Sequence, residues 1–264
     1  MLDFHSHILP GLDDGAPDME TALAMARIAV EDGITTMVAT PHFIEGSMEN
    51  NRDLILGKVT EFQRVLYEVN ILLKVLPGCE VFLSPDTPAR LQKGELMTVN
   101  NKGKHLLVEL PLQCVPSYAE QVLFDLKVMG VTPVIAHPER NVELAGKPEL
   151  FLNLVNRGCL MQINGGSING LYGKKVQKAA RILIINGLIH FIGSDGHSCN
   201  RRTTRIRKAL DTIEKFRAGQ KNTVMGYSNK VINGEDLIPI TPISIDGPMI
   251  NIWQKCKEKI WSFL

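Results

Sequence analysis

Two histidines, His5 and His7, stand one residue apart near the start of the chain, in the segment DFHSHILPGLDDG of residues 3–15. In an extended strand, residues i and i+2 point to the same side, so these two imidazoles face one place. That arrangement indicates metal binding, although two surface histidines at a strand end would give the same pattern. The remainder of the chain has to distinguish the two interpretations.

Further histidine and carboxylate side chains recur along the chain, each at or just beyond the carboxyl end of an apolar segment. They are His42 (in ATPHF), Glu80 (PGCEV), Glu109 (LVEL), His137 (IAHPER), and Asp195 and His197 (GSDGH). Taken singly, each could be a capping group or a surface charge. Taken together, they predict one cluster of ligand-type side chains. His105 and His190 instead begin their apolar segments, so we expect them at the opposite end of the fold, in structural roles.

Seven apolar segments predict the buried strands that would carry these side chains. They span residues 2–8, 35–40, 72–81, 105–110, 132–137, 160–164 and 189–195. The segments between them are long enough for crossover helices. In residues 18–33, for example, Asp18 can cap a helix whose apolar face is formed by Leu23, Ala26, Ile28 and Val30.

Alternation of strands and helices predicts an α/β fold with a parallel sheet, and continuously apolar strands fit burial on both faces, as in a barrel. In such a barrel the carboxyl ends of all strands open on one face. Functional sites of α/β barrels lie on that face, so the ligand-type side chains are expected to meet there.

The number of these groups exceeds what one metal ion needs, since three or four protein ligands suffice for a catalytic zinc. The sequence therefore predicts two or three ions, with Asp14 as a further candidate ligand. Carboxylates suit manganese, and imidazole also accepts iron or zinc, so manganese is the favoured ion. A multinuclear site with a bridging carboxylate is typical of phosphoester hydrolysis. Arg140 and Arg202 belong to loops on the same face and can hold phosphate oxygens; solvated loop arginines are the alternative.

The composition excludes some classes of protein. A net charge of +1, from 29 basic and 28 acidic residues, lacks the basic excess of a nucleic-acid-binding protein. Five cysteines without CxxC spacing, and a start that enters directly into a strand pattern, predict a reduced, cytoplasmic protein. No apolar run reaches the length of about 18 residues needed to span a membrane, so no transmembrane segment is expected.

One motif points to a different mechanism. Cys199 precedes Arg205 by six residues, which is the Cys-x5-Arg spacing of cysteine-dependent tyrosine phosphatases. In those enzymes a thiolate attacks phosphorus within a loop of backbone amides that needs glycines to curl around the phosphate. The five intervening residues here contain no glycine. Metal chemistry is therefore the favoured interpretation.

In order and spacing, DFHSHILPGLDDG, ATPHF, GCE, VEL, AHPER and GSDGH closely resemble the polymerase-and-histidinol-phosphatase (PHP) superfamily. Within it they resemble the manganese-dependent protein tyrosine phosphatases of bacterial capsule and exopolysaccharide operons. The resemblance covers roughly residues 1–235. It implies a distorted, TIM-like barrel of seven strands and three metal ions. The substrate it implies is a phosphotyrosine cluster on a membrane-associated tyrosine autokinase that governs polysaccharide export.

The resemblance also implies a role for individual residues. Asp13 competes with Asp14 for one of these roles, and Arg140 and Arg202 match the arginines that the family places on phosphate. The implied ligands are His5, His7 and Asp195 for the first ion, Glu80 as a bridge to the second, Glu109 and His137 for the second, and His42, His197 and Asp14 for the third.

Two other functions stay open at this point. A small-molecule phosphatase of the same superfamily, such as a histidinol-phosphate phosphatase, would share the metal ions and differ in its pocket. A non-catalytic regulatory PHP domain would keep only the fold, and the presence of ligand-type residues at every expected strand end argues against it.

The chain is expected to form one metallophosphatase barrel over residues 1–236, followed by a linker and an amphipathic helix within residues 237–264. The apolar stripe of that helix recurs at spacings of three or four residues. Docking on the chain's own barrel is the favoured outcome, with a partner, a subunit or a membrane surface as alternatives. The stripe consists of Met249, Ile252, Trp253, Cys256, Ile260 and Phe263.

Overall fold

The computed structural model describes residues 1–237, and the predicted linker and amphipathic helix lie outside the described residues apart from Leu237. Most strands of the described part run parallel to their neighbours. Their bounds are β1 Leu2–Ser6, β2 Thr36–Ala39, β3 His42–Ile44, β4 Met48–Glu49, β5 Lys74–Pro77, β6 Glu80–Phe82, β7 His105–Glu109, β8 Thr132–Ala136, β9 Leu160–Asn164 and β10 Phe191–Gly193.

The strands form two hydrogen-bonded groups, in the orders β1-β2-β5 and β10-β9-β8-β7-β6-β3-β4. The strand predicted over residues 72–81 is broken in the middle, because β5 continues into β6 after Gly78 and Cys79. A similar break follows β2, which continues into β3 after Thr40 and Pro41. A side chain at Gly78 would collide with Val38, because a Cβ there would lie 2.7 Å from Val38 Cγ1. The breaks fall side by side, since β2 pairs with β5 before them and β3 with β6 after them.

Hydrogen bonds also join the first strand to the segment that follows the last one. Asp195 N donates to His5 O at 2.8 Å, and His7 N donates to Gly196 O at 2.9 Å. Ser6 and Gly196 form a parallel bridge. The predicted α/β fold with a parallel sheet is confirmed, and this connected path of strands is the one expected of a distorted barrel.

The short hairpin of β3 and β4 was not expected from the sequence; its strands pair antiparallel through Phe43 with Glu49 and Ile44 with Met48. Both strands are too short to show a two-residue alternation. Their importance is positional, because His42 is the first residue of β3 and pairs with Glu80, the first residue of β6. The strand break thus places two ligand-type side chains next to each other.

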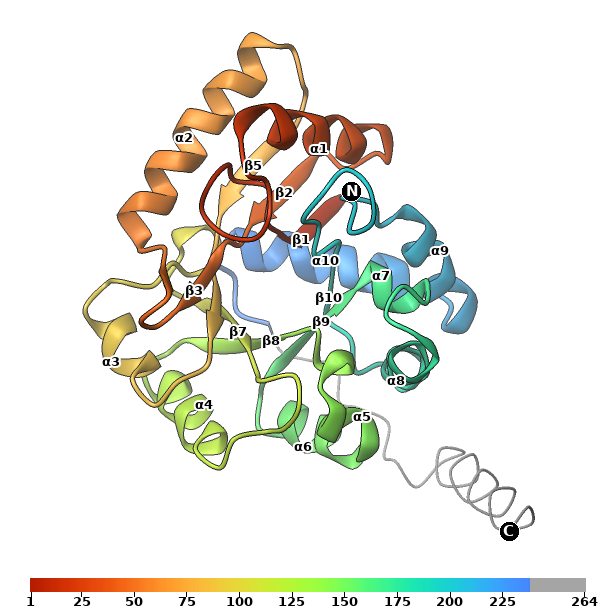
Figure 1. Ribbon diagram of the computed structural model, residues 1–264. Coiled ribbons are helices and arrows are strands. Elements are labelled where there is room, and N and C mark those ends of the chain that lie inside the picture. The colour runs from red at the N-terminus through yellow and green to blue at the C-terminus, as the bar shows by residue number, and fades with distance from the viewer. Residues whose placement is uncertain (238–264) are drawn as a thin grey trace.

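Helices surround the strands (Figure 1), and α10 contacts β1 and β10 across one end of them. The 3-10 helices are η1 Val99–Asn101 and η2 Pro138–Arg140. The α-helices are α1 Met19–Glu31, α2 Arg52–Glu68, α3 Thr87–Gln92, α4 Ala119–Val128, α5 Val142–Gly146, α6 Glu149–Asn156, α7 Gly165–Ile168, α8 Lys174–Ile185, α9 Arg207–Phe216 and α10 Gln220–Ile232. None of the helices in residues 1–237 is long and apolar enough to cross a membrane.

Helix α1 begins where the sequence predicts, because the Asp18 side chain accepts a hydrogen bond from Thr21 N and caps it. Its buried face differs from the prediction: Leu23, Ile28 and Val30 are only partly buried. The fully buried stripe contains small residues, which allow the helix to approach the sheet closely. It consists of Ala22, Met25, Ala26 and Ala29.

The apolar core has two layers. The larger layer includes the buried faces of outer helices such as α1 and α2, and the smaller, inner layer consists of side chains from strands including β1, β7 and β9 and from α10. In the inner layer the rings of Phe4 and Phe191 stack with centroids 4.1 Å apart. Val231 of α10 belongs to the same layer. This end of the strands is therefore filled with apolar side chains, and any polar site has to lie at the other end.

Candidate metal centre

Strand β1 places His5 and His7 in one buried cluster, although strict alternation along this strand is interrupted by an irregular register between Asp3 and Ser6. The His5 Nε2 and His7 Nε2 atoms lie 3.1 Å apart. Glu80 Oε2 is 3.1 Å from His5 Nε2 and 3.2 Å from His7 Nε2. All three side chains are buried, so their atoms face one another rather than solvent.

The tautomers of these two histidines follow from what their other nitrogens contact. His5 Nδ1 lies 2.9 Å from Gln162 Oε1, and His7 Nδ1 lies 2.6 Å from Asp13 Oδ2. Both partners are acceptors, so each Nδ1 carries the proton and, in the neutral imidazole, each Nε2 presents a lone pair. Two lone pairs and a carboxylate oxygen then point at the same spot. This donor set fits a cation, because a metal ion favours three converging acceptors that would otherwise repel one another.

A second group of ligand-type atoms includes both oxygens of Glu80. His137 Nε2 is 2.8 Å from Glu80 Oε1 and 3.6 Å from Glu109 Oε1. His42 Nδ1 is 3.3 Å from Glu80 Oε2 and 3.9 Å from Glu109 Oε2. The two oxygens of Glu80 therefore face different histidines, which is the arrangement that a bridging carboxylate requires.

A third group lies toward solvent and contains Asp14. Asp14 Oδ1 is 3.2 Å from His197 Nε2 and 3.6 Å from His42 Nε2. His197 Nδ1 donates to Asp195 O at 2.9 Å, so its Nε2 presents a lone pair toward Asp14. His7 belongs to this group as well as to the first, and His42 lies between the second and third groups. The resemblance assigned His42 to the third ion alone.

The two neighbouring aspartates, Asp13 and Asp14, have different surroundings in the structure. The Asp13 side chain is 1% exposed, and its oxygens are engaged by His7 Nδ1, Gly15 N and His42 N. The Asp14 side chain is 55% exposed and faces His42 and His197. Asp13 therefore has the geometry of a group that orients His7, and Asp14 has the geometry of a ligand.

Asp195 and the two arginines form the remaining side of the cluster. Arg140 Nη1 donates to Asp195 Oδ2 at 3.0 Å, and Arg202 Nη2 donates to Asp195 Oδ1 at 2.8 Å. Asp195 Oδ1 is also 3.5 Å from His7 Nε2 and 3.7 Å from His5 Nε2. Both arginine side chains thus lie at the edge of the cluster and are partly exposed. Within the Arg202 side chain, the Nε atom itself is buried and has no hydrogen-bond partner among the described residues.

Charge interactions shift the pKa values across the cluster in opposite directions. Burial alone would raise the pKa of the Glu80 carboxyl, but His5 and His137 hold it well below its usual value. Burial and the neighbouring Glu80 charge raise the pKa of Glu109 to about 7. Burial disfavours protonated His7, yet the adjacent Asp13 carboxylate raises the pKa of His7 well above its usual value. Without cations the cluster relies on protonated histidines to balance its carboxylates.

The cluster is supported by three further residues, which were not predicted from the sequence. Gln162 accepts from His5 Nδ1 and His137 N, and donates to Asn164 Oδ1 at 2.9 Å. Asn164 Nδ2 donates to Asp195 Oδ2 at 2.6 Å. The Arg140 guanidinium stacks over the Tyr172 ring at 4.5 Å. Gln162 and Asn164 alternate on β9, so two polar residues in a buried strand were the signal that could have revealed them.

Cys199 and Arg205 do not form a phosphate-binding loop. The Cys199 Sγ lies 3.8 Å from Thr21 O, and Arg205 Nη2 lies 3.2 Å from Glu31 Oε2. Thr21 and Glu31 are near opposite ends of α1, and ten residues of helix span about 15 Å. The thiol and the guanidinium are therefore held at different places.

Comparison with known proteins gives the same picture. Residues 1–232 match the family described as capsular polysaccharide synthesis, CpsB/CapC. The chain is 40% identical over 215 residues to tyrosine-protein phosphatase YwqE of Bacillus subtilis, covering 81% of this chain and 84% of that protein. A structure from a study of YwqE and of Streptococcus pneumoniae CpsB, described as metal-dependent tyrosine phosphatases, superposes with a TM-score of 0.88 at 35% identity. That match covers 92% of this chain and 98% of the other.

A more distant structure shares the fold. Histidinol phosphate phosphatase from Lactococcus lactis matches with a TM-score of 0.53 at 15% identity, covering 83% of this chain and 93% of that one.

Proposed function

The chain belongs to the CpsB/CapC capsular polysaccharide synthesis family, and from this premise we propose that it is a metal-dependent protein-tyrosine phosphatase. The observation that carries the proposal is the convergence of His5 Nε2, His7 Nε2 and Glu80 Oε2 within 3.2 Å of one another. Three acceptors at such distances fit a cation bound between them. The relatives named as tyrosine phosphatases support the choice of reaction.

We propose three ion positions, with manganese as the favoured ion and iron or zinc as alternatives. The mixture of imidazole and carboxylate donors supports manganese over a purely thiolate- or imidazole-selective ion. The ligand sets are His5, His7, Glu80 and Asp195 for the first ion, Glu80, Glu109 and His137 for the second, and Asp14, His42 and His197 for the third. Asp13 orients His7 and is not a ligand.

The reaction is hydrolysis by direct attack of water on phosphorus, with no phosphoenzyme. A bond forms between the water oxygen and phosphorus, the bond to the tyrosine oxygen breaks, and the products are tyrosine and phosphate. Divalent ions bound at such a centre lower the pKa of water and neutralise phosphate charge. The tyrosine hydroxyl has a pKa of about 10, so it leaves with less help from a proton donor than an alkyl alcohol needs.

Arg140 and Arg202 hold the phosphate oxygens in this scheme. A guanidinium can donate two parallel hydrogen bonds to a phosphate, and it stays protonated throughout. Arg140, at the end of η2, and Arg202 both donate to Asp195. The Nε of Arg202 is a buried donor without a partner among residues 1–237. Stacking on Tyr172 restricts the Arg140 side chain and so fixes the direction of its donors.

The substrate we propose is a phosphotyrosine segment of a bacterial tyrosine autokinase associated with the membrane, and the place of action is the cytoplasm. The capsule context of the family supports this partner, and a partly exposed Asp14 supports access for a protein segment. A small-molecule phosphatase acting on histidinol phosphate is the alternative substrate class.

Metal analysis combined with hydrolysis assays tests the proposal. The purified protein should contain more than one equivalent of metal and hydrolyse a phosphotyrosine peptide faster than histidinol phosphate. Chelation should abolish activity, and Cys199→Ser should leave it intact. Activity that survives chelation but is lost in Cys199→Ser would contradict metal-dependent hydrolysis, whereas preference for histidinol phosphate would contradict only the substrate.

A further inference from the structure

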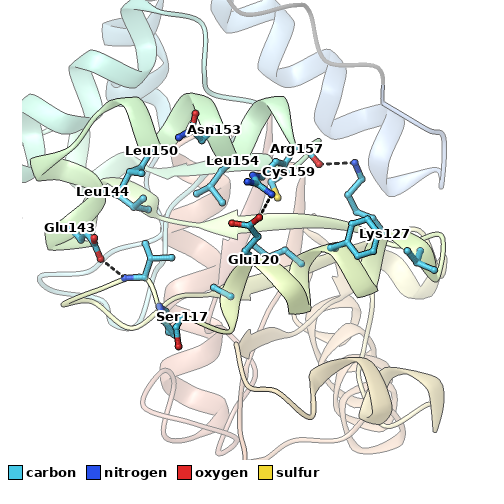
Figure 2. A pocket seen from close by; sticks show the side chains of 16 residues that line it. Ser117, Glu120, Lys127, Glu143, Leu144, Leu150, Asn153, Leu154, Arg157 and Cys159 are labelled. Carbon is cyan, nitrogen blue, oxygen red and sulfur yellow. Dashed lines mark hydrogen bonds and ion pairs between the residues drawn. The ribbon is translucent and has the colours of Figure 1, made fainter.

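An apolar groove of about 690 Å³ lies between α4 and α6, lined also by residues 115–117 and α5 (Figure 2). Its floor includes the buried side chains of Leu123, Leu144 and Cys159. On its α4 side, Phe124 is 61% exposed and Val128 is 71% exposed. Two large apolar side chains so exposed on adjacent turns of one helix form a surface that a partner would cover.

The charged groups of the groove are already engaged with one another. Glu120 pairs with Arg157, Lys127 Nζ donates to Arg157 O at 2.7 Å, and Glu143 Oε2 accepts from Val115 N at 3.0 Å. None of the described residues that line the groove belongs to the candidate metal centre. The groove therefore favours an apolar occupant and not a phosphate or another anion.

The described part of the chain ends close to this groove. Asp236 Oδ1 accepts from Lys104 Nζ at 3.2 Å, and Lys104 directly precedes β7. Cys159, on the floor of the groove, directly precedes β9, and β7, β8 and β9 are neighbours in the sheet. Neighbouring strands are about 4.8 Å apart, so about 10 Å separates β7 from β9. With the length of the Lys104 side chain added, the chain leaves the described structure within about 20 Å of this end of the groove.

The remaining chain has the length and the pattern to fill the groove. Residues 238–247 can span about 30 Å when extended, which is more than the distance required. Residues 248–264 then carry the apolar stripe predicted from the sequence, with lysines mainly on the other faces. We propose that residues 248–264 bind back into the groove between α4 and α6 of the same chain, as an amphipathic helix that covers Phe124 and Val128.

Intrinsic tryptophan fluorescence tests this intramolecular docking, because both tryptophans of the protein, Trp253 and Trp261, lie in this segment. In the dilute full-length protein the emission should be at short wavelength and weakly quenched by acrylamide. Phe124→Glu should shift the emission to longer wavelength and increase quenching. Tyr67→Glu is the matched control, because Tyr67 is an 84% exposed aromatic residue on α2, away from the groove, and this variant should leave the emission unchanged.

Val128→Glu provides a second groove variant in case Phe124→Glu does not fold, which circular dichroism and phosphatase activity would reveal. Emission typical of exposed tryptophan in the dilute full-length protein would overturn the proposal. So would an emission shift that depends on protein concentration, which would indicate a second copy, or one that needs anionic phospholipid vesicles. Short-wavelength emission unaffected by either folded groove variant would place the segment elsewhere and also overturn it. None of these outcomes bears on the proposed phosphatase activity.

Discussion

The two ends of the strands both carry histidines, yet the surroundings of those histidines are opposite. At the carboxyl ends, five imidazoles lie among carboxylates, and the pKa values of His7 and His137 are raised by Asp13 and Glu80 despite burial. At the amino ends, His105 is the first residue of β7 and His190 directly precedes β10. Burial lowers the pKa of both to about 4.

The difference shows that histidine serves a structural role at one end of the strands and belongs to the candidate metal centre at the other. His190 Nδ1 accepts from Met161 N at 3.0 Å, and its ring stacks on Tyr227 of α10 with centroids 6.0 Å apart. A neutral imidazole there satisfies a buried backbone donor and fills space. At the other end the imidazoles converge with carboxylates on shared points, an arrangement that fits a bound cation. The location of these two histidines, expected from their positions in the strands, is confirmed.

The largest effect on turnover should come from Glu80→Ala, with His137→Ala close behind. Loss of the carboxylate that we propose as the bridge should disturb two ion positions at once, and metal-ion stabilisation worth several kcal/mol corresponds to about a 10³-fold loss of kcat/KM. Metal content measured by plasma emission spectrometry should fall in parallel. His105→Ala and His190→Ala are the matched controls and should keep their metal. Metal loss in folded His190→Ala would contradict the conclusion that only the carboxyl ends of the strands carry metal ligands.

Asp13→Asn should have the next largest effect, acting through His7. Removing the carboxylate from His7 Nδ1 leaves the ligand but weakens its basicity and orientation, so metal affinity should fall about 10–100-fold. Titration of the apo-protein with Mn²⁺ would measure this metal affinity. Added metal should restore the turnover of Asp13→Asn, and Asp14→Asn should not be rescued to the same extent. If added metal fully restored the turnover of Asp14→Asn, and Asp13→Asn had normal metal affinity, the assignment of Asp14 as the ligand and Asp13 as the orienting group would be wrong.

Arg202→Lys and Arg140→Lys should weaken catalysis while leaving metal content unchanged. Lysine keeps the charge but loses the paired donors of the guanidinium, and a hydrogen bond to a charged group is worth about 1.5–3 kcal/mol, or roughly a 10–100-fold loss of kcat/KM. Hydrolysis of a phosphotyrosine peptide and metal analysis should be run on the same preparation. Metal loss in either variant would show that the arginine supports Asp195 instead of phosphate.

His190 should influence stability with pH and leave turnover unchanged. Its pKa is lowered from 6.5 to about 4 by burial, so the unfolded chain binds the proton more readily than the folded protein. The contribution of neutral His190 is therefore present above about pH 6.5 and is lost as the pH falls toward 4, by up to about 3 kcal/mol. Urea denaturation between these pH values should show a shallower pH dependence in His190→Gln; an unchanged slope would contradict the buried neutral state.

Much of the fold and of the candidate site could be predicted because both follow from local patterns. Apolar strands that alternate with helices require a parallel sheet, and side chains at the carboxyl ends of such strands necessarily share one face. For that reason His5, His7, Glu80, Glu109, His137 and Asp195 could be selected by residue type and position alone. The short hairpin of β3 and β4 escaped prediction because its strands are shorter than any detectable period.

The sequence by itself determined which chemical groups the chain brings to that face, since residue type and place in a strand are local properties. Only the tertiary structure decided what each group contacts. Asp13 and Asp14 are neighbours of equal chemistry, and the loop conformation alone turns one to His7 Nδ1 and the other to His197. Gln162 likewise meets His5 across 157 positions of sequence. Such contacts depend on distances between strands, which packing and twist set and no local pattern records.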